Sequence, residues 1–409
     1  MVSKVSKFAP KEISIFHQID GVNISVTSCG FKKKKKNDLV LIKFCEPSRI
    51  FSFFTKSTTP GNPIIWNKSI SYHSKISALL INSGNANVFN GSSGKKAIKE
   101  IVNFLSVKLK VKKEEIYLAS TGIIGEKFET QKIIKSIPFL IENLGNTAKA
   151  WKSAANAIRT TDTYDKISSI RGGTKNNIVL NGIAKGSGMI APNMATMLAF
   201  IFTNVQIDKN LKKQKIKQLV DETFNSITVD SDTSTSDMIM VISVKQKSEN
   251  FGKTSSKTIN LFLSLLKKTM YELSHQIVKD GEGVTKFITI HVEKAKNDLE
   301  AKKIAMSVAN SPLFKTAMSS SDLNWGRIIM AVGKSGAKIN TNKISLKLGN
   351  YNILKNGNLV LRSENAVRKY LSNDEIYLSI DVGFSTGSSK IYTCDLTTEY
   401  IKINANYRS

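Results

Sequence analysis

Near its middle the chain reads Lys185-Gly186-Ser187-Gly188-Met189-Ile190-Ala191-Pro192-Asn193-Met194-Ala195-Thr196-Met197-Leu198, a loop sequence that leads into an apolar run. Its glycines and Pro192 predict an irregular loop, and residues 197–202 predict a buried strand. Thr196 therefore stands at the mouth of a buried strand, a position that suits a nucleophilic hydroxyl group. Loop-to-strand junctions with Thr are common, so spacing alone leaves a purely structural role open.

Strand-like and helical patterns alternate along the rest of the 409 residues, which suffice for two lobes or one large α/β unit. We expect strands over 78–81, 116–119, 238–244 and 287–292, and helices over 97–105, 130–144, 147–158, 211–224 and 256–278. The tail 376–403 is rich in β-branched and aromatic residues and predicts a terminal sheet. The pattern indicates an α/β fold, a layered sandwich with central β-sheets flanked by helices.

The charge of the chain raises one alternative function. There are 60 Lys and Arg against 32 Asp and Glu, a net charge of +28, which is typical of a nucleic-acid-binding protein. However, the lysines are scattered through amphipathic segments, and no helix-turn-helix, zinc-finger or RNA-recognition motif occurs. We therefore expect no nucleic-acid partner and keep this function as the less favoured alternative.

The cysteines and the N-terminal residues bear on the location of the protein. Cys29, Cys45 and Cys394 are odd in number and lack CxxC spacing, so they favour neither a disulfide framework nor a metal site. The N-terminal residues contain no apolar signal core, and no apolar run reaches 18 residues. We expect a cytoplasmic protein without a membrane partner or a bound metal.

A longer stretch around the central loop, 182–198, resembles the signature of the ornithine acetyltransferase (glutamate N-acetyltransferase) family of arginine biosynthesis. The resemblance implies that the Ala195–Thr196 bond is broken autocatalytically and that Thr196 then carries the acetyl group. It thus implies an N-terminal-nucleophile-type self-processing architecture, with an alpha chain 1–195 and a beta chain 196–409. Further matches at 229–237, 311–317 and 322–327 extend the resemblance over nearly the whole chain.

An N-terminal Thr solves the problem of the catalytic base. A Thr hydroxyl is a poor nucleophile without a base, and the freed α-amine, with a pKa of about 7.7 to 8.0, can accept its proton. Cleavage would therefore create the base and expose the nucleophile together. The four histidines, His17, His73, His275 and His291, show no paired spacing and are not needed.

Other matched motifs supply expected partners of Thr196. Ser120-Thr121-Gly122 matches the family's Ser-Thr-Gly motif, so Thr121 and Gly122 are the candidate oxyanion hole, although a plain strand-to-helix turn fits the residues too. Lys185 supplies a cation suited to a carboxylate. By resemblance, the substrate contacts besides Thr196 and Lys185 are Thr161, Glu282, Asn404 and Ser409.

Several positions depart from the family pattern, and they bear on substrate specificity rather than on the acyl chemistry. They are Val88, Phe89, Arg159, Ser236 and Leu323.

The sequence thus predicts an enzyme that moves the acetyl group of N2-acetylornithine to glutamate through acetyl-Thr196, giving ornithine and N-acetylglutamate. No cofactor is expected, and acetyl-CoA is an open alternative donor. The resemblance implies a heterotetramer of two alpha and two beta chains. A self-cleaving aminopeptidase or amidohydrolase, which would hydrolyse its acyl-enzyme, is the closer alternative.

Overall fold

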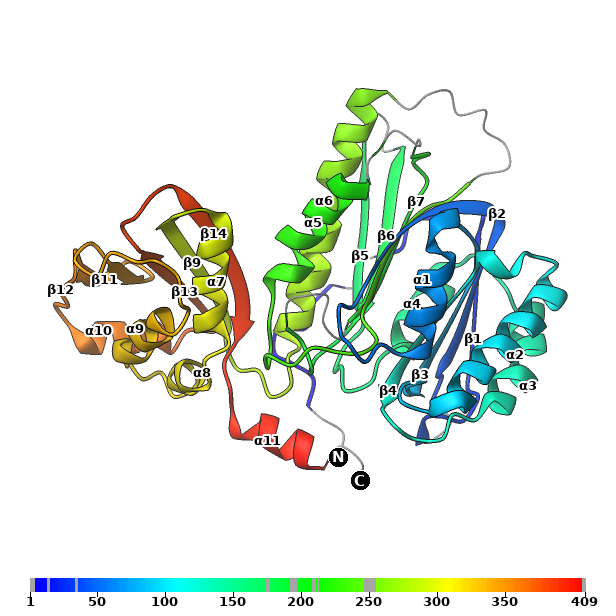
Figure 1. The fold of residues 1–409 in the computed structure, drawn as a ribbon, viewed down its shortest axis with the longest axis horizontal. Helices are drawn as coiled ribbons and strands as arrows, with labels where there is room; N and C mark the ends of the chain where they lie inside the picture. The colour runs from blue at the N-terminus through cyan, green and yellow to red at the C-terminus, as the bar shows by residue number, and fades with distance from the viewer. Residues whose placement is uncertain are drawn as a thin grey trace.

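The computed structural model describes residues 4–12, 15–33, 36–173, 177–191, 197–207, 211, 213–245 and 255–406. An eight-stranded sheet and a six-stranded sheet build a larger and a smaller lobe, which lie side by side (Figure 1). The chain therefore forms two lobes, one of the two arrangements that its length allowed.

The larger sheet runs in the order β4-β3-β2-β8-β7-β6-β5, and β1 pairs with β2. Its strands are β1 (Val22–Thr27), β2 (Leu39–Phe54), β3 (Lys75–Asn85), β4 (Ile116–Ile123), β5 (Lys166–Gly172), β6 (Ile178–Lys185), β7 (Leu198–Thr203) and β8 (Met238–Ser243). Two pairs are parallel, β3 with β4 and β7 with β8, and the others are antiparallel.

Strand β2 folds this sheet into two layers. The first part of β2 pairs with β1 and β3, and its last part, Arg49–Phe54, pairs with β8. The register of the pairing with β3 shifts between Lys43 and Ser48, on either side of Pro47. Proline cannot donate to a ladder, which favours such an irregularity. The two halves share one hydrophobic core, in which Phe44 of β2 stacks on Phe202 of β7 with ring centroids 6.2 Å apart.

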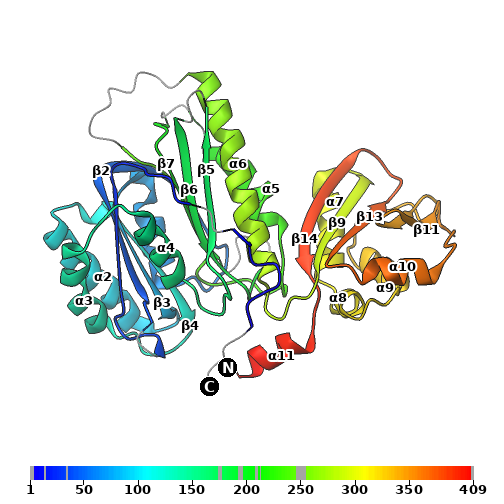
Figure 2. The ribbon, with the colours of Figure 1, turned by 180° about the vertical axis from the view of Figure 1, so that it is seen from behind.

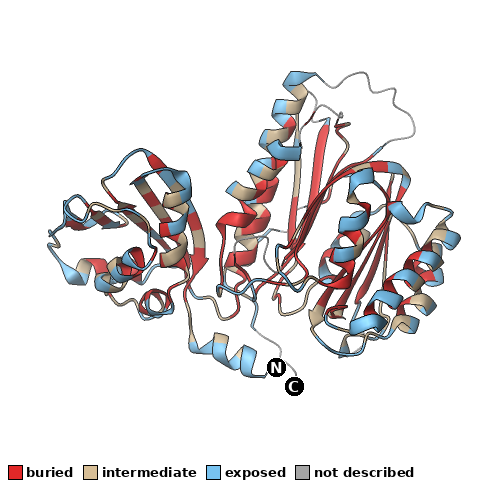
Figure 3. Ribbon diagram, viewed as in Figure 1, coloured by how far each residue is buried: buried red, intermediate tan, exposed pale blue. Residues whose placement is uncertain are grey.

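Helices complete the layers of the larger lobe. Helices α2 (Gly91–Leu109) and α3 (Thr130–Glu142) cover the outer face of β3 and β4, and α5 (Lys213–Glu222) and α6 (Ser256–Lys279) cover the outer face of β5 to β8 (Figures 1 and 2). Helices α1 (Asn62–Ile70) and α4 (Ala148–Ala157) contribute to the inner core. Figure 3 shows that the helices flanking the larger sheet bury one side and expose the other, as expected for helices that flank a sheet.

The smaller lobe is a sheet covered by helices. Its strand order is β12-β11-β10-β13-β9-β14. The strands are β9 (Phe287–Ala295), β10 (Ser345–Leu348), β11 (Tyr351–Lys355), β12 (Asn358–Leu359), β13 (Glu375–Asp381) and β14 (Gly387–Cys394), and the helices are α7 (Asp298–Ala309), α8 (Pro312–Ser319), α9 (Trp325–Gly333) and α10 (Glu364–Leu371). Phe287 and Cys394 also belong to the core around α6, which joins the two lobes.

The predicted layered α/β sandwich is confirmed, but the terminal sheet was predicted too long. Residues 376–394 supply β13 and β14, whereas α11 is a helix, Thr398–Ala405. None of its residues is buried. Helix α11 is fixed instead by tertiary contacts, among them the Thr397 hydroxyl donating to the Gly283 carbonyl. These contacts override the β propensity of its Ile and Tyr residues.

Within the described ranges, no helix has both the length and the apolar character needed to cross a membrane.

Candidate active site

The predicted site forms where the two layers of the larger lobe meet. Lys185 ends β6, and Thr121 and Gly122 lie near the end of β4 in the opposite layer. The Lys185 ammonium group donates to the hydroxyl oxygens of Thr160 at 2.8 Å and Thr121 at 3.3 Å. The structure therefore brings together the predicted cation and a predicted oxyanion donor, which are 64 residues apart in sequence.

Lys185 is an unusual cation because it is almost fully buried. Burial lowers the pKa of its ammonium group, and the carboxylates of Asp162, Glu282 and Asp237 offset only part of that shift. Among the described residues, no carboxylate forms an ion pair with this ammonium group, and such a buried cation suits an anionic group of a substrate.

Gly122 adopts a backbone conformation that requires glycine. Its φ is +128°, and a Cβ atom there would lie 2.3 Å from the carbonyl carbon of Gly84 on β3. The close approach of the two strands at this point therefore depends on Gly122. Ser120-Thr121-Gly122 lies within β4, which extends to Ile123, and not in the strand-to-helix turn that was the alternative. The oxyanion role stays a prediction.

A second chain of contacts joins three of the predicted substrate residues. The Thr161 and Ser187 hydroxyl oxygens lie 2.7 Å apart, and the Ser187 carbonyl accepts the backbone N–H of Glu282 at 2.9 Å. The side-chain amide of Asn404 on α11 donates to Oε2 of Glu282 at 2.8 Å. Gly188 leaves the space for this acid, because a Cβ atom there would lie 2.5 Å from the Glu282 carboxyl group.

Ala195, Thr196 and Ser409 lie outside the described residues. The residues on either side of 192–196 are held by two aspartates. Asp230 accepts the backbone N–H of Ile190 at 2.8 Å, and Asp237 accepts that of Met197 at 2.9 Å. β6 and β7 pair in register, with Lys185 opposite Leu198, so the strands before and after the proposed cut share one sheet.

Asp237 has no predicted role in the site, although it lies within the matched stretch 229–237. Its side chain is buried, and within the part of the chain that the structure describes its Oδ2 atom has no hydrogen-bond partner. Burial raises the pKa of this carboxyl group well above its usual value, more than the Met197 N–H and the Lys185 charge lower it. No spacing rule would have singled it out.

Arg159, one of the positions that depart from the family pattern, contacts the segment that contains Thr161. The Arg159 guanidinium group donates to the Asp162 carbonyl and pairs with the Asp165 carboxylate at 2.7 Å. Arg159 therefore supports the backbone beside Thr161.

His291 lies on β9. His291 bonds to the Tyr377 hydroxyl at 2.7 Å and the Ser388 hydroxyl at 3.0 Å in the smaller lobe. The described residues include no group of three or more His, Cys, Asp or Glu side chains placed to hold a metal ion.

The fold and the site define an α/β enzyme with a hydroxyl and cation cluster beside a loop between paired strands. A model of the ArgJ family matches residues 23–409, and the chain belongs to this family. It is 40% identical over 418 residues to the Arginine biosynthesis bifunctional protein ArgJ of Bartonella henselae and 38% identical over 417 residues to that of Brucella suis, covering 100% of each chain.

A crystal structure of the protein of the same name from Bacillus halodurans is 38% identical and covers 51% of this chain and 98% of its own, with a TM-score of 0.47. The family predicted from the motifs is confirmed, and with it an enzyme of arginine biosynthesis. Membership of this family disfavours the nucleic-acid-binding alternative.

Proposed function

We propose that the chain is a glutamate N-acetyltransferase that carries the acetyl group of N2-acetylornithine to glutamate on the hydroxyl group of Thr196. The observation that carries this proposal is the contact between Lys185 and Thr121. It joins the buried cation at the end of β6, the strand that leads into the loop before Thr196, to the hydroxyl group of Thr121 on β4.

The first half of the reaction forms an acetyl ester. The Thr196 Oγ atom attacks the acetyl carbonyl carbon of N2-acetylornithine, and the Thr196 α-amine accepts the hydroxyl proton. Thr121 and Gly122 donate to the negative oxygen of the tetrahedral intermediate. The C–N bond then breaks, the proton passes to the departing amine, and ornithine leaves.

The second half reverses these steps with a different amine. The amino group of glutamate attacks the acetyl ester, and the C–O bond breaks to regenerate the Thr196 hydroxyl group. Lys185 and Glu282 carry opposite charges and suit the carboxylate and ammonium groups that both substrates possess. Thr161, Asn404 and Ser409 complete the proposed substrate contacts.

The Thr196 hydroxyl group would also release the α-amine of Thr196 by cleaving the chain. In the uncut chain, Thr196 Oγ attacks the Ala195 carbonyl carbon, the acyl group moves from nitrogen to oxygen, and water hydrolyses the resulting ester. Support comes from the described residues on both sides, because Asp230 and Asp237 anchor the chain next to the cut. The products are the alpha chain 1–195 and the beta chain 196–409.

The proposed assembly and setting follow the sequence expectations. Because β6 and β7 pair across the cut, the two fragments stay together, and we propose that two such units form a heterotetramer. The proposed reaction needs no cofactor and takes place in the cytoplasm. Acetyl-CoA as a second donor is tested by adding it to glutamate without N2-acetylornithine.

Trapping of the acetyl-enzyme tests the proposal. Incubation with N2-acetylornithine alone should add one acetyl group to the beta chain, and mass spectrometry of peptides should place it on Thr196. Ornithine should then discharge it much faster than water does. Discharge by water at the same rate without an amine would favour the aminopeptidase or amidohydrolase alternative.

A further inference from the structure

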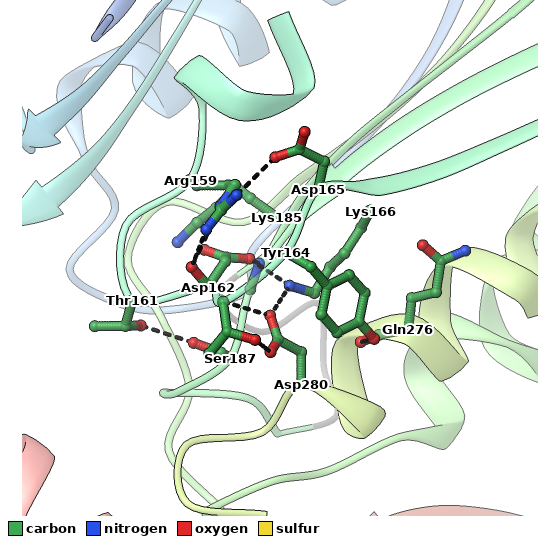
Figure 4. Close-up of polar contacts among 12 residues, drawn as sticks. Arg159, Thr161, Asp162, Tyr164, Asp165, Lys166, Lys185, Ser187, Gln276 and Asp280 are labelled. Atoms are coloured by element: carbon green, nitrogen blue, oxygen red, sulfur yellow. Dashed lines mark hydrogen bonds and ion pairs between the residues drawn. The ribbon is translucent and has the colours of Figure 1, made fainter. Parts of the chain in front are cut away.

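A buried charge cluster lies directly behind the candidate site. The Lys166 ammonium group at the start of β5 pairs with Oδ1 of Asp162 at 2.7 Å and with Oδ2 of Asp280 at 2.6 Å (Figure 4). All three side chains are completely buried. The acetyl-transfer mechanism above uses none of them.

Each carboxylate of the cluster also holds a backbone segment of the site. Asp162 follows Thr161 in sequence and accepts the backbone N–H of Gly186, the residue after Lys185, at 2.6 Å. Asp280 precedes Glu282 by two residues. The cluster is therefore one or two residues away from three of the proposed substrate contacts.

Asp280 is tied to the segment 160–163 a second time, through Thr163. The backbone N–H of Thr163 donates to Oδ2 of Asp280 at 2.8 Å, and the Thr163 hydroxyl group donates to Oδ1. Figure 4 shows the Asp280 carboxylate close beneath Asp162 and Lys166. One aspartate thus fixes the loop after α6 against the loop before β5.

The charges keep Asp162 and Lys166 ionised in spite of burial, whereas burial raises the pKa of Asp280 more than Lys166 lowers it. Burial alone raises the pKa of Asp162, but the ammonium groups of Lys166 and Lys185 and the Gly186 N–H outweigh it, so this pKa lies well below its usual value. Burial lowers the pKa of Lys166, and its two carboxylate partners more than reverse that effect. A buried ion pair of this kind favours one geometry over others.

The proposed cut divides the residues of the cluster between the two fragments. Asp162 and Lys166 precede residue 195 and belong to the alpha chain, whereas Asp280 follows it and belongs to the beta chain. Thr161 and Lys185 are likewise in the alpha chain, and Glu282 is in the beta chain. The two sides of the proposed substrate site therefore belong to different fragments.

We propose that Asp162, Lys166 and Asp280 form an inter-fragment clamp of positioning residues, which sets Glu282 of the beta chain against Thr161 and Lys185 of the alpha chain. This inference rests on the proposed function, since it assigns the clamp to the same substrate site. Displacement of binding groups by about 1 Å can cost about 100-fold in rate.

The variant Asp280→Asn tests the clamp, because it keeps the shape of the side chain and removes one charge. We expect the KM values for N2-acetylornithine and glutamate to rise at least tenfold, with kcat changed less than threefold and cleavage intact. The control is Glu115→Gln, which removes a buried carboxylate whose partner, the Ser77 hydroxyl, lies at the other end of β3 and β4. It should lose stability without a change in KM.

The inference would be overturned if the KM values of Asp280→Asn stayed within twofold of those of the unaltered enzyme while its stability fell like that of the control. The cluster would then have a structural role only. Failure of the unaltered enzyme to exchange acetyl groups would instead refute the proposed function.

A milder variant keeps the test decisive if Asp280→Asn does not fold. Thr163→Val removes one hydroxyl group that donates to Asp280 and preserves the side-chain shape. We expect KM to rise two- to fivefold for both substrates and the fragments to separate at lower urea concentration. Unchanged KM values with unchanged fragment separation would count against the clamp.

Discussion

The ammonium nitrogen of Lys185 lies 3.3 Å from the hydroxyl oxygen of Thr121, although the two residues belong to strands in different layers of the larger lobe. This contact depends on the fold of β2, which brings the two halves of one sheet face to face. A group that recognises a carboxylate and a group that can stabilise an oxyanion are thereby placed side by side.

Removal of the Lys185 charge should weaken the use of both substrates. Lys185→Met should lower kcat/KM about 30- to 150-fold, because a hydrogen bond to a charged group contributes about 2 to 3 kcal/mol. Steady-state kinetics with each substrate in turn gives the two values. Lys315→Met, which removes a buried lysine of the smaller lobe that bonds to Thr393, is the control and should leave kcat/KM unchanged.

A methyl group at Gly122 should disable the acyl chemistry. In Gly122→Ala the new Cβ atom would meet the backbone of Gly84, so the end of β4 must shift, and we expect kcat to fall at least about 100-fold, as for loss of an oxyanion donor. Gly125→Ala is the matched control, since Gly125 also has a positive φ of +83° but open space around it. Equal kcat values for the two variants would show that Gly122 has no catalytic role.

The buried carboxyl group of Asp237 should matter for cleavage. Asp237→Ala leaves the Met197 N–H without its acceptor, at a cost of about 1 to 3 kcal/mol, and should slow the appearance of the two fragments about ten- to hundredfold. Asp237→Asn keeps an acceptor oxygen and imitates the neutral acid that burial favours, so most of the rate should remain. A time course on denaturing gels compares them, and equally slow cleavage in both variants would contradict this role.

His275 should make the stability of the lobe junction depend on pH. It packs against Tyr271, Tyr392 and Phe287, with ring centroids 3.8, 4.2 and 5.2 Å away. Burial lowers its pKa to about 4, a direction to which Lys279 adds. The folded state therefore prefers the neutral ring, and this contribution is complete above pH 6.5 and is lost as the pH falls toward 4.

The loss amounts to about 3 kcal/mol, from about 1.4 kcal/mol per pKa unit. Urea unfolding of the unaltered enzyme and of His275→Phe between pH 7 and 4 measures it as a difference, because the other titrating groups are common to both proteins. Parallel stability curves for the two proteins would contradict the assignment.

Local patterns predicted much of the fold, as the elements around α3, α4, α6 and β9 show. They could not predict that β2 folds the sheet into two layers. This arrangement depends on the pairing of β2 with β3 and with the distant strand β8, and the local sequence around Pro47 does not specify those partners. The helix α11 was missed for the same reason, because its position depends on contacts with Gly283 and Glu282 rather than on its own propensity.

The site was predicted unevenly. Motifs identified Thr121, Lys185 and Glu282, which the structure brings into one neighbourhood. No motif identified a role for Asp237 or Lys166. The proposed roles of these buried groups depend on their contacts with Met197 and Asp280, which are distant in sequence.

The mass of the fragments in the purified enzyme, before and after incubation with N2-acetylornithine, tests the central claim most directly. We predict two chains, 1–195 and 196–409, and one acetyl group added to the N-terminal Thr196 of the second. The variant Thr196→Ala should remain one chain and transfer no acetyl group. A single intact chain that still exchanges acetyl groups between N2-acetylornithine and glutamate would contradict the account.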